Sequence, residues 1–196
     1  SSTDTDKREI PGGFTEDFCK LLTDLYLPSD YDETYHEYDA IYLQQPVSIW
    51  SEDYIGLEDK VLQECADVCG ELLIIRCHPL TLKNPRLNGV RYDNDNYPWE
   101  IVCAEQISHK NILIGIFSTA QFSPKQLYDK EPFMIFLFKL LPPTNVNEAS
   151  EWKVYELLKN SYKDPERVTA PQTIQELREI LTRAKDSSQA INKGMG

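Results

Sequence analysis

The residue types best suited to chemistry are four thiol and imidazole groups in the first half of the chain. Cys65 and Cys69 lie four residues apart, on one face of a predicted helix, and Cys77 and His78 follow at the end of an apolar run. Thiolates and imidazoles are the usual ligands of zinc. The spacing matches no paired C-x-x-C pattern, and small apolar side chains also suit the stripe of a helix that faces a core. We predict structural thiols with no metal and no cofactor, and a zinc-binding Cys/His cluster is the alternative if these side chains converge.

A second reactive combination is the thiol of Cys103 with the imidazole of His109. A thiol nucleophile needs a base within hydrogen-bond reach. Cys103 alternates with Ile101, however, which favours the buried side of a strand. The sequence contains no G-x-S-x-G elbow, no P-loop and no G-x-G-x-x-G motif. We predict no catalytic residue, and a small intracellular enzyme that uses a Cys/His pair is the alternative.

Tyrosines and acidic side chains alternate irregularly over residues 29–39. The segment has neither helical nor strand periodicity, which predicts an exposed loop. Tyrosine rings supply large contact areas, and arginines of a partner can pair with the acids while stacking on the rings. We predict that a partner binds here, through Asp30, Tyr31, Asp32, Glu33, Tyr35, Glu37, Tyr38 and Asp39.

Charge is distributed unevenly along the 196 residues, whose formal net charge is -12. Residues 1–71 contain 18 acidic and 4 basic side chains, whereas the remainder contains 14 acidic and 16 basic ones. An acidic region repels nucleic-acid phosphates and attracts a basic protein surface. We therefore predict a noncatalytic protein–protein interaction module, a subunit or adaptor of a larger intracellular complex. Its partner is a protein with a basic surface, and neither nucleic acid nor membrane is expected to bind.

The cysteines and the apolar runs indicate the compartment. Five cysteines are too few for a disulfide scaffold, and an odd number cannot all form disulfides. All five lie among apolar neighbours, which is typical of free buried thiols in a reducing compartment. The longest apolar run, residues 133–141, contains Lys139 and has about half the length of a membrane-spanning helix. Residues 1–10 lack the apolar stretch of a signal peptide. We expect a cytoplasmic or nuclear protein.

The pattern of apolar residues predicts strands in the middle of the chain and helices at both ends. Apolar residues recur at helical spacing near the N-terminus, with Thr15 as the N-cap and an apolar stripe formed by Phe14, Phe18, Leu21, Leu22 and Leu25. Asn88-Gly89 is the strongest hairpin signal. The other predicted helices cover residues 52–69, 123–128, 147–162 and 173–185, and the predicted strands cover 40–43, 47–50, 72–77, 97–105, 111–118 and 133–141.

This order predicts an α+β fold with one mostly antiparallel central sheet. A single domain is expected over residues 13–186, between flexible tails at 1–12 and 187–196. The last two helices, within residues 147–186, are expected to pack as a helical hairpin against the sheet.

Overall fold

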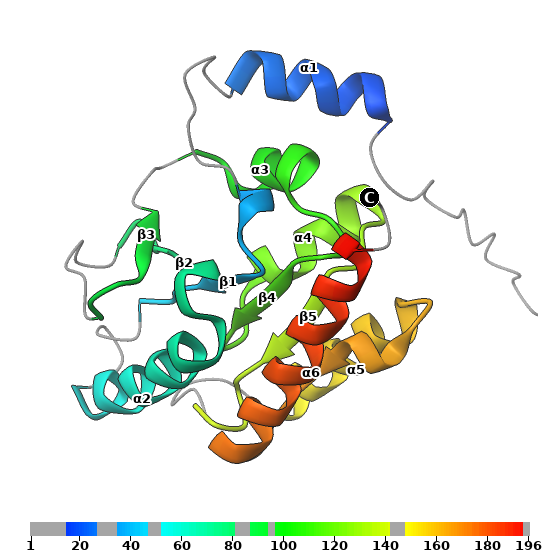
Figure 1. Cartoon of the computed structure of the whole chain (residues 1–196). Helices are drawn as coiled ribbons and strands as arrows, with labels where there is room; N and C mark the ends of the chain where they lie inside the picture. Colours follow the sequence, from blue (N-terminus) through cyan, green and yellow to red (C-terminus); the bar gives the residue numbers. More distant parts are fainter. Residues whose placement is uncertain are drawn as a thin grey trace, which may run out of the picture.

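The strands of the protein form one six-stranded parallel sheet (Figure 1). The computed structural model describes residues 15–26, 35–46, 52–80, 87–93, 97–141 and 148–193. Every pair of neighbouring strands is parallel, and their order is β3-β2-β1-β4-β5-β6. The strands are β1 (Ala40–Leu43), β2 (Leu73–Arg76), β3 (Arg91–Asp93), β4 (Ile112–Gly115), β5 (Phe133–Phe136) and β6 (Val168–Thr169).

The sheet lies between two layers of helices. The chain forms α1 (Glu16–Tyr26), α2 (Glu52–Cys69), α3 (Trp99–Gln106), α4 (Thr119–Tyr128), α5 (Glu148–Ser161) and α6 (Ile174–Lys193). Helix α2 packs against α6, α3 packs against α4, and α1 packs against α3. Figure 1 shows α2 and α6 together in front of the sheet, with α3 and α4 on the other side. The described residues also form the short 3₁₀ helices η1 (Tyr35–Glu37), η3 (Gly70–Leu72) and η4 (Pro165–Arg167).

The predicted antiparallel sheet is wrong, and the correct class is α/β. All four residues of β1, β2, β4 and β5 are buried, which is typical of parallel strands covered by helices on both faces. Parallel neighbours need a crossover of a dozen or more residues. The sequence-based reading assigned residues 97–105 to a strand and so removed α3, the helix that leads from β3 to β4.

Two turn signals have different outcomes. The helix predicted at 52–69 is confirmed as α2, and Gly70 follows its last residue with a φ of 61°. Asn88 and Gly89 form a turn in which Gly89 has a φ of 77°. The predicted hairpin is wrong, because the strand that follows this turn, β3, pairs in parallel with β2.

The C-terminal third differs from the predicted helical hairpin. Strand β6 lies between α5 and α6 and extends the sheet beside β5. The predicted strand at 133–141 is confirmed as an interior strand, although β5 ends at Phe136. Helix α6 continues to Lys193, so residues 187–193 of the predicted tail are helical, and the buried Ser188 donates a hydrogen bond to the Lys110 carbonyl. The predicted tail at 1–12 and the predicted strand at 47–50 lie outside the described residues.

Candidate ligand-binding site

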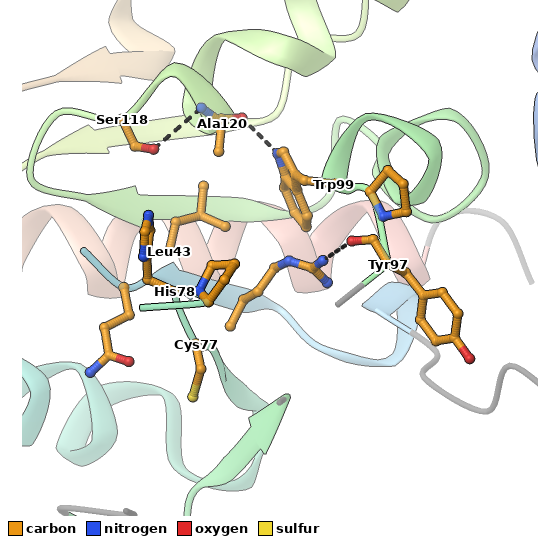
Figure 2. Close-up of a pocket in the computed structure, with 11 residues that line it drawn as sticks. Leu43, Cys77, His78, Tyr97, Trp99, Ser118 and Ala120 are labelled. Carbon is orange, nitrogen blue, oxygen red and sulfur yellow. Dashed lines mark hydrogen bonds between the residues drawn. The ribbon is translucent and has the colours of Figure 1, made fainter. Parts of the chain in front are cut away.

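A cavity opens at the carboxyl ends of the central strands, where the order of the strands reverses. From β1 the chain builds β2 and β3 on one side, and it then returns to build β4, β5 and β6 on the other side. In open parallel sheets the crevice at such a reversal is where ligands bind. The cavity has a volume of about 260 Å³ and is lined by residues 43–44, 76–79, 97–99, 118 and 120 (Figure 2).

The beginning of α4 forms one wall of this cavity. Ser118 is the N-cap of α4, and its hydroxyl accepts a hydrogen bond from the Ala120 N–H at 3.3 Å. The side chain of Gln121 accepts from the Ser118 N–H at 3.2 Å, which completes a capping box. The predicted helix at 123–128 therefore begins earlier, at Thr119. The hydroxyl hydrogen of Ser118 and the positive end of the helix lie on this wall.

The end of β4 is shaped by a close approach to Gln121. A Cβ atom added to Gly115 would lie 2.9 Å from Gln121 Oε1, so glycine is the residue that fits this position. The buried Gln121 side chain also donates to the Ile135 carbonyl at 3.1 Å. Gln121 therefore ties the start of α4 to the neighbouring strand β5.

The ends of β1 and β4 are joined by a side chain where the strand ladder stops. The Gln45 amide donates to the Phe117 carbonyl at 2.8 Å and accepts from the Phe117 N–H at 3.4 Å. The side-chain amide thus forms the same donor and acceptor hydrogen bonds with Phe117 that the backbone of a neighbouring strand would form. It fixes the crevice between the two central strands immediately beside the cavity.

A buried arginine forms the opposite wall. Arg76 Nη1 donates to Asp93 Oδ2 at 2.7 Å and to the Tyr35 hydroxyl at 2.9 Å, and Nη2 donates to the Tyr97 carbonyl. The Tyr35 hydroxyl donates to Asp93 in turn. Burial raises the pKa of Tyr35 above its usual range, so the hydroxyl stays protonated. These contacts hold the Arg76 charge at the end of β2.

Trp99 connects the two walls. Its indole Nε1–H donates to the Ala120 carbonyl at 2.7 Å, and its ring lies 5.3 Å from the guanidinium carbon of Arg76. Tyr35 meets the same ring edge-on, with 5.7 Å between the ring centroids. Figure 2 shows Trp99 between the strand ends and the residues that begin α4.

His78 supplies a neutral hydrogen-bond donor. Its Nδ1 atom accepts from the Leu80 N–H at 3.1 Å, so the neutral ring carries its proton on Nε2. Burial lowers the pKa of His78, which keeps the ring neutral at physiological pH. The cavity is thus lined by the Arg76 guanidinium, whose charge is paired with Asp93, by the neutral His78 ring and by the Ser118 hydroxyl. Among the described residues that line it, none is acidic.

The Cys/His cluster considered from the sequence does not assemble into a metal site. Within the described ranges, no group of three or more His, Cys, Asp or Glu side chains could hold a metal ion. Cys65 and Cys69 belong to α2 and are buried in the core, and of these four residues only Cys77 and His78 line the cavity. Burial raises the pKa of Cys65 and raises that of Cys69 to about 11, so both stay as thiols.

The proposed nucleophile pair is also separated. Cys103 is fully buried within α3, where burial raises the pKa of its thiol, whereas His109 is exposed beyond the end of that helix. A protonated, enclosed thiol is a poor nucleophile. The alternation of Cys103 with Ile101 indicated burial correctly but was read as a strand.

The acidic, tyrosine-rich segment is only partly an exposed loop. Asp30, Tyr31, Asp32 and Glu33 lie outside the described residues. Tyr35 is fully buried, so its interpretation as an exposed contact residue is wrong in this structure. Glu37 is exposed, and Tyr38 and Asp39 are half-buried. Binding of a partner by these three residues stays a prediction.

Sequence reasoning missed the cavity because its residues come from four separate segments. One signal was present: Gln44, His78 and Ser118 each follow an apolar run closely, as polar residues at the carboxyl ends of strands do. Their convergence depends on parallel pairing, and the antiparallel prediction would have placed them at opposite edges of the sheet.

Comparisons with known proteins identify no relative of this chain, so its function is inferred from the fold and the cavity. No protein-family model, no curated protein and no solved structure matches this chain. Within the part of the chain that the structure describes, none of the helices has the length and apolar character needed to cross a membrane.

Proposed function

We propose that this protein binds a phosphorylated small molecule of the nucleotide class in the cavity at the carboxyl edge of the sheet. The observation that carries the proposal is the position of the cavity at the strand reversal of a 3-2-1-4-5-6 parallel sheet. Sheets with this order bind nucleotides at that place. The size is also suitable, because 260 Å³ is close to the lower end of about 300–1,000 Å³ for ligand pockets.

The polar groups and the helix end around the cavity favour an anionic group. The chain has a net charge of -12, yet the described lining residues include no acid, and they include the neutral His78 ring and Arg76, whose charge is balanced by Asp93. The first turn of α4 adds the partial positive charge of a helix N-terminus, with Ser118 beside it. We assign the phosphate to this wall, between His78 and Ser118, and the ring of the ligand to the aromatic side of the cavity near Trp99 and Tyr97.

The phosphate position in this proposal differs from that of a glycine-rich dinucleotide site. Such sites hold the pyrophosphate on a G-x-G-x-x-G turn directly after the first strand. Here Gln44, Gln45 and Pro46 follow β1, and the Gln45 side chain is bonded to Phe117. The turn after β4 therefore takes the role that the turn after β1 has in those proteins.

The test is titration of the full chain with nucleoside monophosphates, the matching nucleosides and inorganic phosphate, by isothermal calorimetry. We expect one nucleotide to bind, its nucleoside to bind more weakly, and phosphate to compete. His78→Ala should weaken nucleotide binding by about tenfold, the loss of one hydrogen bond to a charged group.

His109→Ala is the matched control, because His109 lies exposed away from the cavity. Its affinity should equal that of the wild type. Failure of every nucleotide to bind would contradict the proposal, and so would an equal loss of affinity in the two histidine variants.

A further inference from the structure

Helix α1 presents its apolar stripe to solvent. The exposed fractions are 40% for Phe18, 52% for Leu21, 66% for Leu25 and 56% for Tyr26. Large apolar side chains of a surface helix normally face the core. A contiguous exposed group of this kind on one helix marks an interaction surface.

The flank of the helix contacts the domain. Cys19, Leu22 and Thr23 are the partly buried residues of α1, and Thr23 donates to Glu105 of α3 at 3.2 Å. Helix α1 packs against α3. Phe18, Leu21 and Leu25 have the spacing i, i+3 and i+7, so they form the helix face next to this flank. When the flank packs against α3, this neighbouring face stays exposed to solvent.

The surroundings of the stripe are acidic. Asp17 and Asp24 on α1 and Glu105 on α3 are exposed, and the one basic residue of α1, Lys20, forms an ion pair with Asp24 at 3.3 Å. Next to Glu105, the Gln106 side chain accepts from the Tyr35 N–H at 2.7 Å, so η1 with its exposed Glu37 borders the same end of α3. Exposed carboxylates of α1 and α3 therefore border the stripe.

We propose that this α1 surface, consisting of the apolar stripe and its carboxylates, docks a basic amphipathic segment of a partner protein. Leucine-type side chains of the partner cover Phe18, Leu21, Leu25 and Tyr26, and its lysines or arginines pair with Asp17, Asp24 and Glu105. A second copy of this chain would bring like charges together, and an anionic membrane would be repelled by the same acids. The inference does not depend on ligand binding in the cavity.

The test uses a synthetic helical peptide of about 18 residues, with leucines along one face and lysines on the other, as the probe. Binding to the full chain is measured by fluorescence anisotropy. We expect Leu21→Ala/Leu25→Ala to weaken peptide binding by at least about tenfold. Leu157→Ala on α5 is the matched control, because Leu157 is 63% exposed, and its affinity should be unchanged.

Two further peptides and two assays make the proposal falsifiable. A peptide with glutamate in place of lysine should not bind, and a shuffled leucine–lysine peptide should bind weakly. Equal binding of the wild-type chain to the lysine and glutamate peptides would overturn the charge argument. Unchanged peptide binding by Leu21→Ala/Leu25→Ala would overturn the location. Sedimentation that shows self-association lost in this variant, or flotation on phosphatidylcholine vesicles lost in it, would assign the surface to a second copy or to a membrane instead.

Discussion

Two arginine–carboxylate contacts in this protein lie in opposite surroundings. Arg76 and Asp93 join the end of β2 to the end of β3, and their side chains are 10% and 0% exposed. Arg178 on α6 contacts Glu64 and Asp67 on α2, and the Arg178 side chain is 54% exposed. One contact is enclosed beside the cavity, whereas the other crosses the outer seam between two helices.

The difference shows where charge determines structure. Arg76 has three defined acceptors and a ring beside it, so moving it would leave Asp93 charged and buried without its main partner. Water can replace either partner of Arg178, and salt screens that contact. The enclosed pair therefore fixes the wall of the cavity, whereas the outer pair adds little to the packing of α2 against α6.

The largest effect is expected from Asp93→Ala, which leaves the Arg76 guanidinium buried without its carboxylate. We expect the free energy of unfolding to fall by about 3–5 kcal/mol. Urea denaturation followed by circular dichroism measures it. The double variant Arg76→Met/Asp93→Leu is the control and should recover much of the loss, because it removes both charges. A loss below about 1 kcal/mol in the single variant would show that the pair is solvated.

Tyr35→Phe should have an intermediate effect. The substitution removes the hydroxyl that bonds both Arg76 and Asp93 but keeps the ring against Trp99. We expect a loss of about 1–3 kcal/mol, typical of a buried hydrogen bond to charged groups. The same denaturation experiment measures it. An unchanged midpoint would mean that the hydroxyl adds nothing to the enclosed pair.

Arg178→Gln should change stability much less. We expect a loss of at most about 1 kcal/mol at low salt, and almost none at about 1 M salt, where the Debye length is near 3 Å. Denaturation at both salt concentrations measures the difference. If Arg178→Gln cost as much as Asp93→Ala, the proposed contrast between the two contacts would be wrong.

The smallest effect concerns His78, two residues after Arg76 in the chain. Burial lowers its pKa below the usual 6.5, so the unfolded chain takes up a proton at a higher pH than the folded chain does. The stability that neutral His78 contributes is complete above pH 6.5 and is lost as the pH falls through the folded pKa. The difference in unfolding free energy between wild type and His78→Gln should therefore change between pH 8 and pH 5, with the wild type losing more on acidification. A difference that is constant with pH would contradict a lowered pKa.

Local elements of the fold were more predictable than their pairing. The runs that became β1, β2, β4 and β5 were recognised because buried strands are continuously apolar. Residues 99–106 were misread because the apolar residues of α3 are consecutive over 101–104, so its polar residues mark no helical face. That single error removed a crossover, and with it the parallel sheet.

The helical spacing of the apolar residues in α1 did not predict that they would be exposed. The stripe on α1 has the spacing of a core helix, yet contact of Cys19, Leu22 and Thr23 with the domain turns it outward. Conversely, Tyr35 lies in an acidic segment, yet a basic side chain from β2 and Asp93 from β3 enclose its hydroxyl. The exposure of the α1 stripe and the burial of Tyr35 both depend on residues that are distant in the sequence. The local spacing of apolar residues carries no information about such contacts.

The central place of β1 in the sheet has a consequence for the order in which the protein is made. Strand β1 pairs with β2 on one side and with β4 on the other, and Gln45 finds its partner Phe117 72 residues further along the chain. During synthesis β1 and β2 can therefore associate while the other edge of β1 still has no strand beside it. Contacts over such separations slow folding, and an open strand edge invites pairing with other chains. The cavity is completed only when β4 and the first turn of α4 have left the ribosome, so a chaperone that shields this edge until then should raise the yield of folded protein.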